Sequence, residues 1–206
     1  MAYSRLDNMV DEVFDRLERE VEMTVSDRDE VKKHAFIHNF NPTYNIEDRK
    51  ILPQGLIYII SGTIRSFYYD DNGDINTGIF FTANDCFLFS KDIPQGHFIH
   101  GIDFEVMEPA QCLIIPGQTI SKLRHESIVY ANLCYLLTVV NLSKFFIEER
   151  TYRPLKPYEK YKRFVKEHPE LIDRISQRAI ASYLGVTPVS LSRLKRRYLD
   201  DFDGID

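Results

Sequence analysis

The stretch QRAIASYLGVTPVSLSRLKRR, residues 177–197, predicts two short helices joined by a tight turn. Gly185 ends the first helix, because glycine accepts the positive φ angle at which helices commonly stop. Thr187 can cap the second helix, and Pro188 suits its first position, where a missing N–H costs nothing. The residues expected to pack between the helices are Ile180, Leu184, Val186, Leu191 and Leu194, with the small Ala181 at their closest approach. This is the pattern of a helix-turn-helix.

The opposite face of the second helix predicts contacts with double-stranded DNA. The residues expected to read bases are Val189, Ser190, Arg193 and Arg197. An arginine can place two N–H groups on guanine O6 and N7, and a valine can meet a thymine methyl group. The residues expected to hold phosphates are Ser176, Gln177 and Arg178 at the start of the first helix, and Thr187, Lys195 and Arg196. The alternatives are a plain surface charge for Arg193 and Lys195, and capping alone for Thr187.

Charge is distributed unevenly around this motif. Residues 150–198 hold thirteen Lys and Arg against four Asp and Glu, which is +9, so the rest of this chain of net charge −5 carries −14. Such asymmetry is typical of a basic segment that meets an anionic partner, most often nucleic acid. A solvated basic face is the alternative.

Several protein classes are not expected from the composition. The 206 residues contain no uninterrupted run of eighteen apolar residues, so we expect no membrane span. The N-terminal MAYSRLDNMVDEVF carries acidic residues where a signal peptide has an apolar core, which favours a cytoplasmic protein. Cys86, Cys112 and Cys134 are widely spaced, so we expect buried thiols rather than disulfides or a metal cluster.

The N-terminal part predicts helices followed by short strands. A helix is expected from Arg5 to Val21, and Ser26 or Asp27 can cap a second one that runs through Lys33. The apolar stripe of the first helix is Leu6, Met9, Val10, Val13, Leu17 and Val21. From Phe36 to about Ile115 the β-rich runs are FIHNFN, LIYIIS, TIRSFYY, INTGIFF, FIHGIDFEV and CLIIP. Their spacing, with a hairpin turn at Asn72-Gly73, predicts an antiparallel barrel or jelly roll.

A long apolar helix is expected over SIVYANLCYLLTVVNLSKFFIEE, residues 127–149. One side carries Val129, Leu133, Leu136, Val140 and Ile147, and a second apolar side carries Tyr130, Leu137, Phe145 and Phe146. A helix this apolar needs more partners than a small barrel offers, which predicts a homodimer through the first of these sides. Complete burial within one subunit is the alternative. Arg153-Pro154 and Lys156-Pro157 then break the helix, which gives three expected regions: 1–125, 126–153 and 154–206.

This arrangement resembles the Crp/Fnr family of bacterial transcription regulators. The resemblance rests on LIYIISGTIRSFYYDDNGDINTGIFF, with Gly62 and Asn72-Gly73 at the expected turns, and on ISQRAIASYLGVTPVSLSRLKRR. It implies an α+β fold with a jelly roll like that of cyclic nucleotide-binding domains, a long dimerisation helix and a small C-terminal helix-turn-helix domain of winged-helix type. It further implies a homodimer that reads a near-palindromic operator, is not an enzyme, and has RNA polymerase as a candidate partner.

Departures from the family pattern limit what it implies about cofactors. The nucleotide-binding members have a Gly-Glu pair and a Pro-Arg pair, whereas here Gly-Glu is missing and Pro94 is followed by Gln95. Losing those charge-assisted bonds makes tight cAMP binding unexpected, so the effector is left open. No cysteine precedes Cys86, so no iron–sulfur cluster and no other cofactor is expected. The Arg-Glu pair of the family's best-known reader falls at Pro188-Val189, while its later Arg matches Arg193, so the DNA sequence read should differ.

Two other functions fit parts of the sequence. A jelly roll can be a cupin-type metal enzyme, for which the candidate ligands are His97, His100 and Glu105. Residues three apart on a strand point to opposite faces, so His97 and His100 would need a bulge to share one metal. The chain could also be an effector-binding module that does not bind DNA, although the basic, capped helix argues against it.

Overall fold

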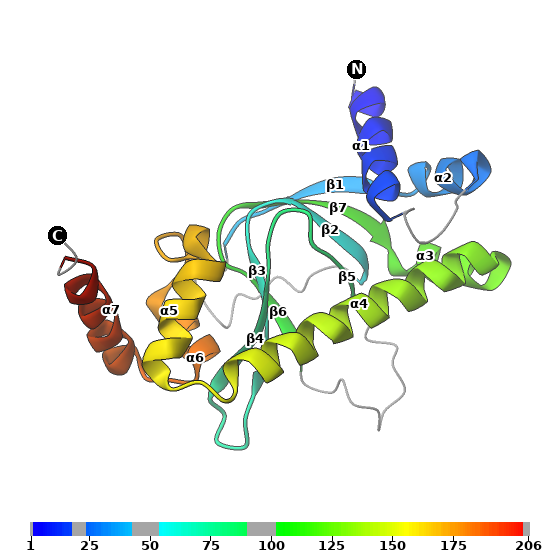
Figure 1. Cartoon of the computed structure of the whole chain (residues 1–206). Coiled ribbons are helices and arrows are strands. Elements are labelled where there is room, and N and C mark those ends of the chain that lie inside the picture. The colour runs from blue at the N-terminus through cyan, green and yellow to red at the C-terminus, as the bar shows by residue number, and fades with distance from the viewer. Residues whose placement is uncertain (1, 18–23, 43–53, 90–101, 204–206) are drawn as a thin grey trace.

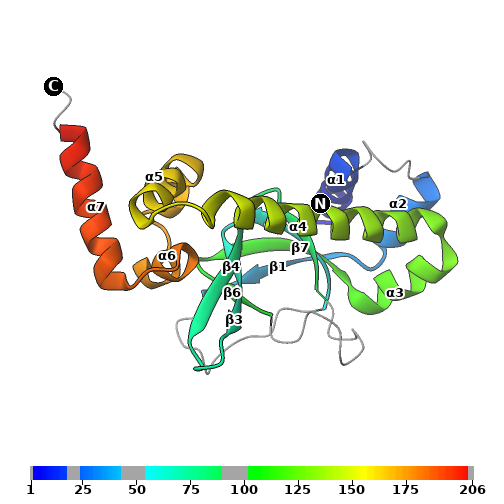
Figure 2. The ribbon, with the colours of Figure 1, turned by 60° about the horizontal axis from the view of Figure 1, so that its bottom comes forward.

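The computed structural model describes residues 2–17, 24–42, 54–89 and 102–203. Helices precede a β-roll of two antiparallel sheets, a long helix runs beside the roll, and further helices follow it (Figure 1). Figure 2 shows the same order from below, with the C-terminal helices at the end of the molecule farthest from the first two. The predicted combination of helices and antiparallel sheet is therefore present.

The two N-terminal helices are α1 (Ala2–Leu17) and α2 (Val25–Lys32). The apolar stripe of α1 is buried at Val10 and Val13, as its spacing predicts. The expected cap of α2 at Ser26 or Asp27 is wrong. The cap is Thr24, whose hydroxyl accepts from the Asp27 N–H while the Asp27 carboxylate accepts from the Thr24 N–H. This reciprocal pair satisfies two donors at once, and so the helix begins two residues earlier than expected from Ser26. Val21 lies outside the described residues.

The β-roll consists of a four-stranded and a three-stranded sheet. The first has the order β1 (Phe36–Phe40), β7 (Ala110–Pro116), β2 (Gly55–Ser61) and β5 (Cys86–Phe89). The second has the order β4 (Ile75–Phe81), β3 (Ile64–Tyr69) and β6 (Asp103–Val106). All pairs are antiparallel. Strand β5 was not expected as a separate strand, because four residues are too few to show a period of two.

The hairpin between β3 and β4 turns where predicted, but not with a two-residue turn. Its connection spans Asp70 to Asp74, and only Gly73 has a positive φ, of 82°. The Asp70 carboxylate accepts from the N–H groups of Asn72 and Asp74, each at 2.9 Å. These local bonds lower the pKa of Asp70 and favour the longer loop over a tight Asn-Gly turn.

Helix α3 (Gly117–Glu126) leads into α4 (Ile128–Tyr152), which lies against the roll (Figures 1 and 2). Tyr130, Leu133 and Leu137 are buried on the roll side of α4. Leu133 therefore belongs to the core of its own subunit, and its predicted place on the dimer side is wrong. Of the other residues predicted for that side, Val129 and Leu136 are half-buried, while Val140 and Ile147 are exposed. Periodicity gives the residues that share a side, but not the rotation of the helix on the roll.

Helix α4 is also long and apolar enough to cross a membrane by length and composition, with a mean hydropathy of 1.4. The expectation that nothing spans a membrane relied on uninterrupted apolar runs, and isolated polar residues interrupt this run without making it polar on average. One side of α4 is packed on protein. Asn141 donates to the Cys86 carbonyl at 3.0 Å, and Lys144 forms an ion pair with Asp85 at 3.0 Å. These contacts hold this side of α4 against strand β5 and the residues before it.

The C-terminal region contains α5 (Pro157–Glu167), a 3-10 turn η2 (Pro169–Leu171), α6 (Gln177–Leu184) and α7 (Pro188–Asp203). Its described residues from 157 to 203 form helices and turns, so the hairpin wing of a winged helix is not seen among them. Phe164, Leu171 and Ile180 are buried in one cluster that also includes Phe80 of β4. The helical region therefore shares its core with the edge of the roll.

The three cysteines are free thiols. Cys112 is buried, and Cys86 and Cys134 are half-buried. Burial raises the pKa of all three, to about 12 for Cys112. Thiols that resist ionisation are poor nucleophiles and poor metal ligands, which agrees with the structural role expected from their spacing.

Candidate nucleic-acid interface

Helices α6 and α7 form a helix-turn-helix with the local geometry that their sequence predicts. Gly185 adopts the left-handed conformation at φ 67°, and its N–H bonds back to the last turn of α6. The Thr187 hydroxyl accepts from the Ser190 N–H at 3.1 Å and so caps α7. Leu184 and Leu191 are fully buried between the helices. Close packing of this kind holds α7 at one angle to α6.

The outward face of α7 is defined by the residues opposite its buried side. Val189 is 64% exposed, and Arg193 and Arg196 are exposed on the same face, since they follow Val189 by four and seven residues. Arg193 therefore lies where the sequence predicts. Arg196, expected beside this face, lies on it instead, while Lys195 is half-buried.

Two residues expected to read bases have partners within the domain. The Arg197 guanidinium lies over the ring of Tyr158, 4.0 Å from its centroid, so it is turned toward α5. The Ser190 hydroxyl accepts from the Thr187 hydroxyl at 2.9 Å. Both side chains support the shape of the domain in this conformation, and a base would have to compete with these contacts.

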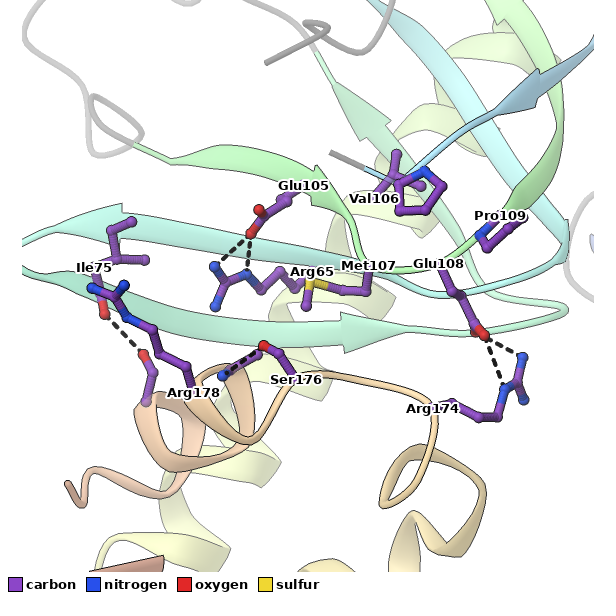
Figure 3. A pocket seen from close by; sticks show the side chains of 13 residues that line it. Arg65, Ile75, Glu105, Val106, Met107, Glu108, Pro109, Arg174, Ser176 and Arg178 are labelled. Atoms are coloured by element: carbon purple, nitrogen blue, oxygen red, sulfur yellow. Dashed lines mark hydrogen bonds and ion pairs between the residues drawn. The ribbon is translucent and has the colours of Figure 1, made fainter. Parts of the chain in front are cut away.

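The start of α6 faces the β-roll rather than the outer face of α7. The Ser176 hydroxyl accepts from the Ala179 N–H and caps α6. Ser176 and Arg178 line a cavity whose other wall comes from β3, β4 and β6 (Figure 3). Gln177 is exposed and donates to the Ile172 carbonyl at 3.5 Å. The expected phosphate contacts at Ser176 and Arg178 are thus not on the surface that α7 presents.

A serine that sequence reasoning missed joins α6 to the sheet. Ser182 accepts from the Thr77 N–H at 2.8 Å and donates to the Ile75 carbonyl at 2.9 Å. Strand β4 lies at the edge of its sheet, so these bonds satisfy main-chain groups that the next strand would otherwise hold. Phe80 and Tyr183 add a ring contact at 5.1 Å between centroids. No signal in the sequence marks Ser182, because a single serine in an amphipathic helix is ordinary.

The described residues do not support a cupin-type metal centre. They contain no group of three or more His, Cys, Asp or Glu side chains that could hold a metal ion. His97 and His100 lie outside the described residues. Glu105 instead forms a buried ion pair with Arg65, at 2.5 Å.

Among the described residues, a cluster of phenylalanine side chains lies inside the roll. Phe87 is stacked on Phe104 with 4.7 Å between ring centroids, and Phe81 and Phe89 pack against the same pair. Pro94 and Gln95 stand where the nucleotide-binding members have a Pro-Arg pair, and they lie outside the described residues. The described part of the roll has the composition of a core, since its phenylalanine side chains offer no donors for a phosphate or a ribose.

No protein-family model matches the sequence, and no curated protein sequence does either. Solved structures do match. A protein described as a transcriptional regulator of the Crp/Fnr family from Eubacterium rectale is 16% identical, with a TM-score of 0.70 over 87% of this chain and 85% of that one. FixK2 from Bradyrhizobium japonicum is 17% identical, with a TM-score of 0.64 over 81% of this chain and 85% of that one.

A third similar structure is CLP of Xanthomonas campestris, described as a regulator responsive to c-di-GMP. It is 16% identical, with a TM-score of 0.57 over 82% of this chain and 88% of that one. These matches cover the roll, the long helix and the C-terminal helices together, so the chain has the fold of Crp/Fnr-type regulators and the predicted fold class is confirmed. The neighbours are transcription regulators and not enzymes.

Proposed function

We propose that this protein is a sequence-specific, DNA-binding transcription regulator that acts as a homodimer. The observation that carries the proposal is the free outward face of α7, where Val189, Arg193 and Arg196 share one side of a capped helix. A helix of this width fits the major groove, and its N-terminal residues contact base edges. The fold agrees with this assignment, since the proteins described as regulators from Eubacterium rectale and Xanthomonas campestris share it.

The dimer in this proposal forms through α4. Residues on the side of α4 opposite the roll are exposed and apolar at alternating steps of three and four: Tyr135, Val139, Leu142 and Phe146. This side replaces the one expected from the sequence, on which Leu133 is buried and Val129 and Leu136 are half-buried. A period of 3.5 is the seam of a two-stranded coiled coil. A second copy packed on this seam removes these four large apolar side chains from water. A lipid surface is the other partner for such a side, and the dimer is favoured because Leu137, Asn141 and Lys144 hold the opposite side of α4 on protein.

The proposal also covers the operator, the bases read and the place of action. The operator is near-palindromic, since a two-fold dimer presents two copies of α7. Arg193 reads a guanine, Val189 contacts a thymine methyl group, and Arg196 binds the backbone or an adjacent base. The regulator acts in the cytoplasm, where its DNA is, and RNA polymerase is a candidate partner once it is bound.

The test is selection of bound DNA from a random pool, followed by affinity measurements on the selected operator. Arg193→Ala removes a bidentate contact and should cost about 1–3 kcal/mol per half-site, with relaxed preference at one base pair. Lys166→Ala removes one charge from the exposed side of α5 and serves as the matched control. It should leave the preference intact.

The same selection separates the proposal from its main rival. An effector-binding module without DNA binding would enrich no sequence at physiological salt. Equal affinity and equal base preference in Arg193→Ala and the unaltered protein would show that α7 does not read DNA with this face.

A further inference from the structure

A cavity of about 610 Å³ lies between the three-stranded sheet and the start of α6 (Figure 3). One wall carries Arg65 of β3, Ile75 of β4 and Glu105 of β6, and the other carries Arg174, Arg178 and Ser182. This volume is in the range of pockets that hold small organic ligands. The cavity lies at the joint between the roll and the helix-turn-helix, outside the phenylalanine cluster of the described roll.

Two of the three arginines in the cavity are neutralised. Arg65 forms its ion pair with Glu105 and also donates to the Thr77 hydroxyl at 2.8 Å. Arg174 bonds both carboxylate oxygens of Glu108, at 2.9 and 2.7 Å. Each pair holds its charges in fixed places, so these four side chains contribute shape and polarity but no net charge.

The third arginine is the source of the net charge. Arg178 is exposed and makes no hydrogen bond or ion pair with any described residue. Figure 3 shows its side chain reaching along the wall toward Ile75, at the end of the cavity away from the Arg174–Glu108 pair. The charged side chains that line the cavity therefore carry a net charge of +1, and this charge lies at the Arg178 end.

Apolar side chains complete the lining. They are Val106, Met107, Pro109 and Ala179, which lie alongside the Arg65–Glu105 pair and the Arg174–Glu108 pair. A cationic end together with these apolar side chains fits a ligand with one anionic head and a compact apolar body, because the head gains a charge-assisted bond while the body leaves water.

We propose that this cavity binds a small organic anion, a carboxylate or a phosphate monoester with an apolar body, through Arg178. The bound molecule touches the roll and α6 at once, and so strengthens the contact that Ser182 already makes with β4. The proposal goes beyond DNA binding and stands whether or not α7 reads DNA, since it concerns a site on the other side of α6.

The test is calorimetric titration of the full-length protein, without DNA, with benzoate, phenyl phosphate, inorganic phosphate and the uncharged benzyl alcohol. We expect saturable binding of benzoate or phenyl phosphate in the millimolar range or tighter. The preferred one of the two identifies the head group, while inorganic phosphate and benzyl alcohol should bind more weakly because each lacks one half of the ligand.

Arg178→Gln should weaken binding of the preferred probe about tenfold or more, since it removes the charged donor. Lys166→Gln, which removes a charge on α5 outside the cavity, should not change it. Circular dichroism of both variants checks that the helices are retained. The proposal is overturned if neither organic anion binds saturably, if Arg178→Gln binds as well as the unaltered protein, or if benzyl alcohol binds as tightly as benzoate.

Discussion

At the scale of single residues, Gly62 and Gly73 share a backbone conformation but not an environment. Their φ angles are 93° and 82°, a region that side chains with a Cβ rarely adopt. A Cβ on Gly62 would come within 2.6 Å of Ala110, whereas a Cβ on Gly73 would meet nothing within 4 Å. Gly62 is therefore needed for its size as well as its conformation, because β2 and β3 turn there directly beside the start of β7.

This difference gives a stability prediction. Gly73→Ala should cost about 1 kcal/mol in the free energy of unfolding, from the backbone conformation alone. Gly62→Ala should cost at least about 2 kcal/mol more, because the new methyl group overlaps Ala110. Urea unfolding of the two variants side by side measures this, and equal costs would show that the turn shifts freely away from β7.

Glu148 predicts a pH dependence of stability. It lies on α4, where burial raises the pKa of its carboxyl group to about 7, with Lys144 and Tyr183 opposing the shift and Asp85 and Glu167 adding to it. The folded protein thus keeps a proton that the unfolded chain releases near 4.5. The free energy of unfolding should fall as pH rises from about 4.5 to about 7.

Glu148→Gln should remove this fall, because the amide does not ionise. We expect the variant to be more stable than the unaltered protein at pH 8, by up to about 3 kcal/mol, and to differ little from it at pH 5. Glu149→Gln, at the exposed neighbouring position, should retain the pH dependence. Parallel unfolding curves for all three proteins across this pH range would refute the role of Glu148.

At the scale of helices and strands, α4 has one side packed on the roll and one exposed apolar side. Its roll side is fastened by Tyr130, Leu137 and the Lys144–Asp85 ion pair. Its opposite side presents the coiled-coil seam, on which Leu142 is 52% exposed. The two sides lie on opposite halves of one helix, so a dimer can form without disturbing the roll.

Leu142→Glu should therefore dissociate the dimer and leave the subunit folded, because a carboxylate in the seam would be buried without a partner. Sedimentation at micromolar concentration should give a monomer for this variant and a dimer for the unaltered protein. Ser121→Glu adds the same charge to an exposed position of α3 and should remain dimeric. A monomer without any substitution would refute the proposed assembly.

At the scale of the whole molecule, the position of the helix-turn-helix depends on a few contacts between α6 and β4. Ser182 makes two hydrogen bonds to the strand edge, the Thr77 hydroxyl donates a third to the Ala179 carbonyl, and Phe80 packs against Tyr183 and Phe164 in the C-terminal core. These contacts decide where α7 points relative to α4 and hence relative to its copy in a dimer. A ligand in the adjacent cavity would act on the same junction.

Ser182→Ala should loosen this junction. The Thr77 N–H loses its partner, which costs about 1–3 kcal/mol if the group stays buried. We expect faster hydrogen exchange of the α6 amides and a lower melting temperature. Ser121→Ala, at an exposed position of α3, should change neither. Unaltered exchange in Ser182→Ala would show that the other contacts hold the junction together.

The sequence by itself determined the elements whose signals lie within a few residues. Gly185, Thr187 and Pro188 defined the turn and the start of α7, the spacing of Val10 and Val13 defined the buried stripe of α1, and short β-rich runs indicated the roll. Each of these depends on local hydrogen bonds or on the period of one helix or strand, which neighbouring residues encode together.

Only the tertiary structure decided the rotation of α4, the side of α6 on which Arg178 lies, and the cavity between roll and helices. The Ser182–Ile75 bond joins residues 107 apart, and the Lys144–Asp85 bond joins residues 59 apart. A periodic pattern predicts which residues share a face, but it does not predict which other element that face contacts. The partner of each face depends on the packing of all the helices and strands together. Leu133 is buried on the roll because the free energy gained by removing it from water there does not depend on the stripe to which its spacing assigns it.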